Sequence, residues 1–440
     1  MKRYETYKDS GILWLDAIPS HWHEEKLKHI STCNDEVLSE DTPDELIIHY
    51  VEISDVDSVS GINNHTDYTF ANAPSRARRI TRKNDVIIST VRTYLKAIAT
   101  VKEDDLIVST GFAVIRPTKV NQKYLAYSLL NDDFLGEVIS KSVGVSYPAI
   151  NATDLIEIKI PVPPREEQET IAAYLDRKVG QIDATIAENE QMLEDLKNYR
   201  SAIISEAVTK GLDKNVEMKD SGIVWMGLIP KHWVIKRLKF VSVNIDGTHY
   251  SPETKETGKP YVTATDIRGK GIDYAFTKKI SLTDYDKLVE QGCKIELNDV
   301  LLVKDGATTG RVGLMTDNEE CVALSSVAML RPKDEIHPLF LMYSMMSNSM
   351  QIQITNSMAG SAMPRITLTK LNEFVVCVPP PNEQKEISVF VDNKVEQIDK
   401  TLLELESQIH DLKSYKSALI TEAVTGKIDL REWKPKKENV

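Results

Sequence analysis

The sequence predicts an α+β protein made of two tandem copies of one unit, each a mixed α/β domain followed by a long helix. Two observations predict this fold. Segments of the first half recur in the second half at a nearly constant offset, and each copy ends in a long stretch almost free of proline and glycine. The two stretches share one spacing of apolar residues, so we expect their helices to pair as a coiled coil, and the duplication makes the antiparallel direction the expected one.

The repeat begins with the segment Asp-Ser-Gly-Ile at residues 9–12, which recurs at residues 220–223, an offset of 211. The offset rises only to 216, at the Glu-Ala-Val-Thr segments of residues 206–209 and 422–425. Such a small drift indicates one ancestral unit duplicated in tandem, with a few residues inserted.

Four of the five tryptophans fall at equivalent positions of the two copies: Trp14, Trp22, Trp225 and Trp233. Equivalent placement indicates packing that anchors the start of each unit to the helices, with stacking on nucleic-acid bases as the alternative. His21 and His232 accompany them, and we assign these histidines a structural role.

The first part of each unit alternates short apolar runs, such as residues 86–88 and 300–303, with Gly, Asp and Asn turns. This pattern predicts short strands and a few helices. The second part follows a proline cluster, at residues 163–164 and 379–381, and such a cluster before a breaker-free stretch marks a helix start.

Apolar residues of both stretches follow alternating steps of 4 and 3, which is typical of a left-handed coiled coil. The alternative is two separate amphipathic helices, each lying on its own domain. Pairing around a pseudo-twofold axis would make the helices antiparallel and place the two domains at opposite ends. The expected seam comprises Leu175, Val179, Ile182, Ile186, Leu193 and Leu196 of the first helix and Val395, Ile398, Leu402, Leu405, Ile409 and Leu412 of the second.

The bulk composition excludes several classes of protein. A net charge of −12 argues against a protein that coats DNA non-specifically. The charged N-terminus lacks the apolar core of a signal peptide, and no apolar run reaches the length of a membrane helix, so we expect a cytoplasmic protein. The four cysteines form no CxxC pair and predict buried thiols rather than a disulfide or metal site.

The charge is distributed unevenly within the first domain. Between Lys28 and Arg76 there are ten acidic residues and no Lys or Arg, whereas residues 74–102 hold eight basic residues against Asp85 alone. This switch indicates an edge that faces DNA; the alternative is a solvated basic face that balances the acidic stretch. The candidate DNA-binding residues are Arg76, Arg78, Arg79, Arg82, Lys83, Arg92, Thr93, Tyr94 and Lys96.

The equivalent place in the second domain is residues 304–311, Lys-Asp-Gly-Ala-Thr-Thr-Gly-Arg. Its small residues permit close approach of a partner, and its candidate DNA-binding residues are Lys304, Thr308, Thr309 and Arg311. A plain turn between strands is the alternative. The segment does not match the phosphate-binding P-loop pattern, because Arg311 and Val312 follow the second glycine.

Motifs of catalysis are missing from the sequence. It has no Gly-x-Gly-x-x-Gly loop, no Asn/Asp-Pro-Pro-Tyr/Phe element of adenine methyltransferases, no Walker lysine and no His-Glu-x-x-His zinc helix. We therefore expect a chain that is not an enzyme by itself, with no metal and no cofactor of its own.

Two diverged domains alternate with two similar helices, each introduced by Pro-Pro-x-x-Glu-Gln, and each unit opens with Asp-Ser-Gly-Ile…Ile-Pro-x-His-Trp. This arrangement resembles the DNA specificity subunit of type I restriction-modification systems, the HsdS family, over essentially the whole chain. The resemblance implies target recognition domains at residues 1–160 and 213–378, conserved spacer helices at 161–212 and 379–428, and a tail at 429–440. The loop at residues 246–250 is similar to one in some recognition domains of the family, which adds His249 and Tyr250 as candidates, with a surface turn as the alternative.

The resemblance also implies partners and cofactors. Two methylation subunits would bring S-adenosylmethionine, and two restriction and translocation subunits would bring ATP and Mg²⁺. The chain itself would read a bipartite, asymmetric site in double-stranded DNA, one half per recognition domain. A methylation-only or type IIB-like system is the alternative within this class, and a coiled-coil scaffold without DNA function is the alternative outside it.

Overall fold

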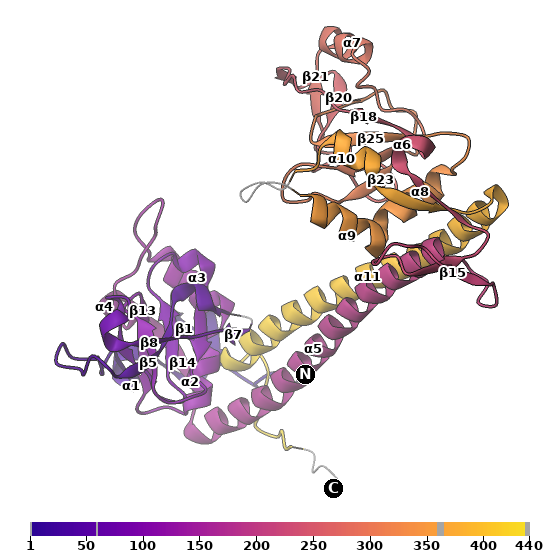
Figure 1. Cartoon of the computed structure of the whole chain (residues 1–440). Helices are drawn as coiled ribbons and strands as arrows, with labels where there is room; N and C mark the ends of the chain where they lie inside the picture. The colour runs from indigo at the N-terminus through magenta and orange to yellow at the C-terminus, as the bar shows by residue number, and fades with distance from the viewer. Residues whose placement is uncertain (1, 59, 359–364, 436–440) are drawn as a thin grey trace. The chain divides into compact units, whose positions relative to one another are not determined.

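The computed structural model describes residues 2–58, 60–358 and 365–435 (Figure 1). The chain divides into two compact units, of which unit 1 comprises residues 1–190 and 406–440 and unit 2 comprises residues 191–405. Two long helices, α5 (Arg165–Lys210) and α11 (Pro381–Val424), contribute to both units. Each unit therefore contains one mixed domain, the first half of the helix next to it, and the last half of the other helix.

The domain of unit 1 is built on two four-stranded sheets. The first has the order β11-β10-β13-β4 and is antiparallel throughout. The second has the order β8-β5-β12-β9 and contains one parallel pair, β5 with β12. The strands are β4 (Ser31–Cys33), β5 (Ile47–Val51), β8 (Thr66–Thr69), β9 (Ala77–Ile80), β10 (Val86–Ser89), β11 (Ile98–Thr100), β12 (Leu106–Ser109) and β13 (Phe112–Pro117).

Smaller elements complete this domain. Three two-stranded pairs are β1 (Tyr7–Ile12) with β2 (Leu15–Pro19), β3 (His23–Lys26) with β14 (Lys159–Val162), and β6 (Val56–Asp57) with β7 (Gly61–Ile62). The short helices are α1 (Leu27–Ile30), α2 (Gln122–Leu129), α3 (Asp132–Ser140) and α4 (Ala152–Leu155). Asn121 and Asn131 begin α2 and α3, because their side chains accept hydrogen bonds from backbone N–H groups of the first turn.

Unit 2 repeats the first sheet with the order β23-β22-β25-β18, which matches β11-β10-β13-β4 strand for strand. Its second sheet, β19-β21-β20-β24, keeps the parallel pair as β20 with β24. The strands are β18 (Ser242–Asp246), β19 (Thr254–Lys255), β20 (Lys259–Val262), β21 (Lys278–Ile280), β22 (Val300–Val303), β23 (Val312–Leu314), β24 (Val322–Ala323) and β25 (Val327–Pro332). The duplication inferred from the sequence is confirmed by these two matching sheets.

The remaining elements of unit 2 also follow the repeat. The pairs are β15 (Met218–Asp220) with β16 (Leu228–Pro230) and β17 (Val234–Arg237) with β26 (Val375–Val378), and the helices are α6 (Leu238–Val241), α8 (Pro338–Met346), α9 (Asn348–Ser357) and α10 (Leu368–Glu373). Helix α7 (Leu282–Glu290) follows β21 where unit 1 has only the 3-10 turn η2 (Phe70–Asn72) after β8, and a single bridge of Lys294 with Val322 stands in place of β9. The two domains thus share a framework and differ in what is attached to the second sheet.

The central strand of each domain is buried on both faces. In β10, Val86 and Ile88 enter one apolar cluster while Ile87 enters another. In β22, Val300 and Leu302 likewise separate from Leu301 and Val303. Successive side chains of a strand point to opposite faces, so a continuous apolar run marks a strand covered on both sides.

The long helices pair in antiparallel fashion within each unit. In unit 1, Lys416 contacts Asp183 and Lys413 contacts Glu190, at 2.7 and 3.1 Å between ammonium and carboxylate. Residue numbers therefore rise along one helix as they fall along the other. In unit 2, Arg200 and Asp399 form a bidentate pair, with 2.6 Å from Nε to Oδ1.

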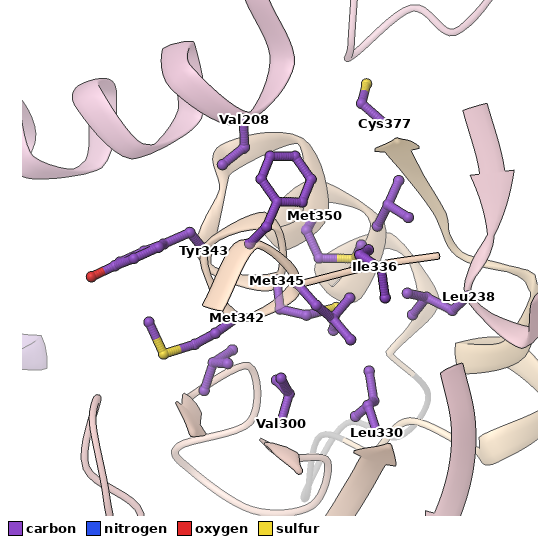
Figure 2. Close-up of a cluster of buried hydrophobic side chains, with 14 of the residues drawn as sticks. Val208, Leu238, Val300, Leu330, Ile336, Met342, Tyr343, Met345, Met350 and Cys377 are labelled. Atoms are coloured by element: carbon purple, nitrogen blue, oxygen red, sulfur yellow. The ribbon is translucent and has the colours of Figure 1, made fainter. Parts of the chain in front are cut away.

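The expected seam residues are buried or half-buried, and neighbouring positions on both helices are mostly exposed. The antiparallel coiled coil predicted from the sequence is confirmed. In unit 2 the last turns of α5 leave the seam and join the core of the domain, where Val208 faces the cluster that contains Met345 and Met350 (Figure 2).

Candidate nucleic-acid interface

The loop after β10 carries the first candidate DNA-binding residues. Arg92 and Lys96 both have left-handed backbone, with φ of +50° and +49°, which is uncommon for residues that bear a side chain. Thr93–Leu95 form one 3-10 turn, η3, between them. The chain therefore reverses sharply, and the side chains of Arg92, Tyr94 and Leu95 are exposed.

A second loop, residues 142–149, fastens this turn. The Arg92 N–H donates to the Pro148 carbonyl at 2.7 Å, and the hydroxyls of Thr93 and Ser142 share a 2.7 Å hydrogen bond. The Arg92 guanidinium lies 4.7 Å from the centre of the Tyr147 ring, within cation–π distance. Residues 91–96 and 142–149 thus form one surface, here called loop pair 1, in which Thr93 is buried and Tyr147 is 65% exposed.

The turn at residues 110–111, between β12 and β13, joins loop pair 1 to the start of β9. The Thr110 N–H donates to the Arg76 carbonyl at 2.9 Å, and the Thr90 N–H donates to the Gly111 carbonyl at 2.8 Å. Arg76 is exposed beside this turn. These two hydrogen bonds connect the segment before β9, which carries Arg76, with the end of β10, which leads into the Arg92 loop.

Other basic side chains of this segment have partners within the domain. Arg82 forms a bidentate contact with Glu36, at 2.5 Å from Nη2 and 3.1 Å from Nε, and Arg78 lies over the Phe70 ring at 4.7 Å. Arg79 is half-buried, and burial lowers its pKa from the ordinary arginine value. Glu36 of the acidic stretch thus pairs with Arg82, while the side chains of Arg76, Arg82, Lys83 and Arg92 are exposed.

Lys96 and Asp132 connect loop pair 1 to the helices of unit 1. The Lys96 ammonium lies 2.6 Å from a carboxylate oxygen of Asp132 at the start of α3, and the other oxygen of Asp132 accepts a hydrogen bond from Ser417 of α11. Partial burial raises the pKa of the Asp132 carboxyl group, but the hydrogen bonds donated by Lys96 and Ser417 outweigh it, so the pKa lies below the ordinary value.

In unit 2 the structure buries Lys304, which is 1% exposed. Its ammonium lies 3.3 Å from Asp246 and 3.1 Å from Asp305, and Asp305 also contacts Arg365 at 3.3 Å. A direct contact of Lys304 with DNA would require this network to open. Lys304 instead joins three segments, because Asp246 starts the 246–250 loop and Arg365 follows the 359–364 segment, which lies outside the described residues.

Arg311, Thr308 and Thr309 lie in the same loop as Lys304. Arg311 and Thr308 line a hollow of about 690 Å³ together with Arg268 and with Arg200 of α5. Arg200 is neutralised by Asp399, and Arg268 reaches Asp273 at 3.4 Å, whereas Arg311 is exposed. Because Arg200 and Arg268 are paired with carboxylates, Arg311 is the guanidinium group at this hollow that best suits an anionic partner.

His249 and Tyr250 lie on the neighbouring loop of unit 2. Gly247 fixes its path, because a Cβ there would collide with the backbone of residues 323–324. His249 is exposed and lies 3.5 Å from Asp246, and the Lys287 ammonium lies over the Tyr250 ring at 4.8 Å. Residues 246–250 and 304–311, with Arg365, are here called the loop group of unit 2.

Sequence reasoning did not single out Arg268 and Arg365. The repeat places Tyr147 and Arg365 in equivalent loops. Val91 bridges Ala149 in unit 1, and Asp305 bridges Arg365 at the equivalent place in unit 2. Arg268 has no counterpart of this kind. Its position depends on the turn at residues 268–271, which Gly269 and Gly271 mark in the sequence.

The Glu-Gln elements hold each domain on its helix. Glu167 accepts hydrogen bonds from Trp22 Nε1 at 3.0 Å and contacts His21 at 2.6 Å, and Glu383 does the same with Trp233 and His232 at 3.0 and 2.9 Å. Trp22 and Trp233 are buried, which supports packing over base stacking. Trp14 is half-buried and donates to the Lys159 carbonyl, whereas Trp225 is 44% exposed.

The glutamines of these elements complete the joint. Gln168 accepts from the Asn121 N–H and donates to the Pro163 carbonyl, at 2.7 and 2.8 Å, and Gln384 makes the equivalent contacts with His337 and Pro379. Buried backbone groups need such partners, because unpaired polar groups are costly away from water.

The cysteines are free thiols. Burial raises the pKa of Cys33 to about 11 and those of Cys321 and Cys377 to about 12. A thiol with such a pKa is protonated at neutral pH, so these groups are poor nucleophiles and poor metal ligands. Within the described part of the chain, no helix is both long enough and apolar enough to span a membrane.

The chain thus carries a duplicated mixed domain with basic loops, held on paired helices. The family model for the type I restriction modification DNA specificity domain matches residues 44–197 and 230–411. The chain belongs to this family.

Individual relatives agree. The chain is 27% identical over 311 residues to the type I restriction enzyme EcoBI specificity subunit of Escherichia coli, a match that covers 68% of this chain and 63% of that subunit, less than two thirds of its length. It is 24% identical over 456 residues to the MjaIX specificity subunit of Methanocaldococcus jannaschii, which covers 98% of both. A chain from a solved type I R-M system matches the fold with a TM-score of 0.70 at 22% identity, over 93% of this chain and 99% of that one.

Proposed function

We propose that this chain is the non-catalytic subunit that gives a type I restriction-modification complex its DNA sequence specificity. Each recognition domain reads one half of a bipartite, asymmetric site, and the paired helices set the gap between the halves. Methyl transfer and cleavage belong to partner subunits that bind S-adenosylmethionine and ATP with Mg²⁺, and the complex works on DNA in the cytoplasm.

The observation that carries this proposal is the repeat of one framework with different exposed side chains. The sheet β11-β10-β13-β4 of unit 1 matches β23-β22-β25-β18 of unit 2, and in both units the loop after the central strand is fastened to the loop before a short helix. At these loops unit 1 presents Arg92 and Tyr147, and unit 2 presents Arg311 and Arg365. One framework with two sets of side chains suits two half-sites of different sequence.

The chemistry of the exposed groups fits base reading. Arginine can bond bidentately to guanine in the major groove, and threonine or tyrosine hydroxyls can bond phosphates or base edges. If both domains enter the major groove from one side of the duplex, half-site centres lie about one helical turn apart. Because the chain has a net charge of −12, partner subunits would have to supply part of the positive charge that binds the DNA phosphates.

The repeated helices provide two equivalent surfaces, which would suit two copies of one partner. Tyr199 of α5 and Tyr415 of α11 stand at equivalent positions and are 55% and 51% exposed. Exposed aromatic residues are frequent anchors of protein interfaces. Two equivalent surfaces, one per unit, are what two identical methylation subunits would require.

Arg92→Ala tests the reading of one half-site. Loss of a bidentate contact costs about 1–3 kcal/mol, which is roughly 5- to 150-fold in affinity. Once methylated adenines in host DNA have defined the site, binding of the subunit in complex with its methylase is measured on duplexes altered in either half. We expect Arg92→Ala to relax discrimination at one half and to leave the other intact, and Arg311→Ala to have the reciprocal effect.

Loss of preference at both halves with either variant would contradict the assignment of one half-site per domain. A scaffold without DNA function would show no salt-dependent duplex binding at all in the same complex. A methylation-only or type IIB-like system would give the same binding results and differs in the cleavage activity of the partners.

A further inference from the structure

Two histidines and an aspartate meet at the open edge of the second sheet of unit 1, on the face that His49 shares with Leu106. His49 of β5 and Asp67 of β8 are direct cross-strand partners. His65 precedes Asp67 by two residues, and residues two apart on an extended chain share a face. The sheet register therefore places all three side chains together, although no zinc motif in the sequence links them.

The distances are those of a potential metal site. His49 Nδ1 lies 2.7 Å from Asp67 Oδ1, and His65 Nε2 lies 3.6 Å from the same oxygen. The ligand atoms of the three residues all lie within 4.8 Å of one another, and the imidazole rings are 5.3 Å apart. Among the described residues this is the one group of three or more such side chains with this geometry.

We propose that His49, His65 and Asp67 bind Zn²⁺. Two imidazoles and a carboxylate are ligands that zinc takes in proteins, at about 2.0–2.2 Å, so tetrahedral ligand atoms lie about 3.3 Å apart. The observed separations bracket this value, and the exposed side chains can reach it by small rotations. Zinc would then replace the hydrogen bond between His49 and Asp67.

The fourth coordination position faces water or the adjoining hollow. This hollow, of about 130 Å³, is lined by His65 together with Glu103 and Lys102. Glu103 is a possible carboxylate ligand, whereas the Lys102 ammonium opposes a cation. Water as the fourth ligand is therefore the arrangement that the charges favour.

Bound zinc would fasten the edge of the sheet. Within the residues that the structure describes, strand β8 is the last strand of its sheet and pairs with β5, so its outer edge is open. The ion would join β5, β8 and the chain just before β8, and it would stabilise the folded domain by mass action because it binds the folded state. This role is independent of which DNA sequence the domain reads.

The experiment is a calorimetric titration of the full-length chain, free of any metal-affinity tag, with ZnCl₂. We expect one Zn²⁺ per chain in the wild type, and affinity lower by at least about tenfold in His49→Ala, His65→Ala and Asp67→Asn. The matched control is His29→Ala, since His29 pairs with Glu25 at 2.6 Å but has no third ligand. This control should bind zinc as the wild type does.

A second readout is thermal stability. Zinc should raise the melting temperature of the wild type and of His29→Ala but not of the three site variants, whose folding without zinc is checked by circular dichroism. The proposal is overturned if the wild type binds no zinc, if the site variants bind it equally well, or if His29→Ala weakens binding as much as they do.

Discussion

At the scale of single residues, the joint between domain and helix depends on one carboxylate per unit. Glu167 and Glu383 stand in the first turns of α5 and α11, where the helix dipole favours a negative charge. Each accepts from a buried indole N–H and contacts an imidazole. The Trp, His and Glu residues that recur in the sequence therefore form one contact, and its repetition explains why they recur together.

Gly426 is a second residue on which this joint depends in unit 1. It ends α11 with φ of +74°, and an added Cβ would overlap the Pro19 ring and lie 3.2 Å from Trp22. Left-handed backbone costs a non-glycine residue about 1–2 kcal/mol, and overpacking adds about 1–3 kcal/mol. We therefore expect Gly426→Ala to lower the free energy of unfolding by about 2–5 kcal/mol, measured by urea denaturation.

Gly222→Ala is the matched control for this prediction. Gly222 has nearly the same φ, +72°, but its added Cβ would meet no atom within 4 Å. Only the backbone cost, about 1–2 kcal/mol, should remain. If both variants lost the same free energy of unfolding, the contact of residue 426 with Pro19 and Trp22 would not contribute to the effect.

At the scale of elements, ion pairs between α5 and α11 show that the two helices are antiparallel. Lys416 is partly buried, with its ammonium 2.7 Å from Asp183. Lys416→Glu should lower the free energy of unfolding by about 1–2 kcal/mol, because it sets two carboxylates against each other. The double variant Lys416→Glu with Asp183→Lys should recover most of that loss in thermal unfolding.

Lys394→Glu, a change of the same kind at an exposed position of α11, controls for altered charge and helix propensity. A double variant no more stable than Lys416→Glu alone would argue against the pairing of these two residues.

The elements were predictable from the sequence to the extent that their signals are local. Apolar runs marked β10 and β22, the heptads marked both helices, and the tandem duplication, through its pseudo-twofold axis, marked their direction of pairing. The contacts across the sequence were not predictable in this way. Lys304 is buried because Asp246, 58 residues earlier, folds against it, and Tyr147 meets Arg92 from 55 residues away. No local pattern specifies such partners, so the sequence located the loops better than it identified the side chains that they expose.

At the scale of the whole molecule, the duplication explains why each helix belongs to both units. The first half of α5 packs with unit 1 and its last half with unit 2, and α11 does the reverse. Tyr124 of the first domain donates to the Val424 carbonyl at the end of α11, and Ser205 of α5 accepts from the Asn348 N–H of the second domain. Each domain is thus held by the start of one helix and the end of the other.

The proposed role of the helices as a spacer predicts the effect of shortening them. The ion pairs Asp183–Lys416 and Arg200–Asp399 bracket a region from which residues 185–198 and 401–414 can be removed together. This deletion takes two heptads from each helix, so the seam register is kept and both flanking pairs remain. Each helix becomes about 21 Å shorter, which corresponds to about six base pairs of duplex.

We expect the shortened subunit, in complex with its methylase, to stop methylating sites with the native gap while it keeps the base preferences of each half-site. Mapping of methylated adenines measures both properties. A matched variant lacking only residues 185–198 should instead be less stable to unfolding, because its two helices no longer match in length. Methylation at the unchanged native gap by the doubly shortened subunit would contradict the spacer role, since a rigid helix pair about 21 Å shorter cannot place two domains on the same pair of half-sites.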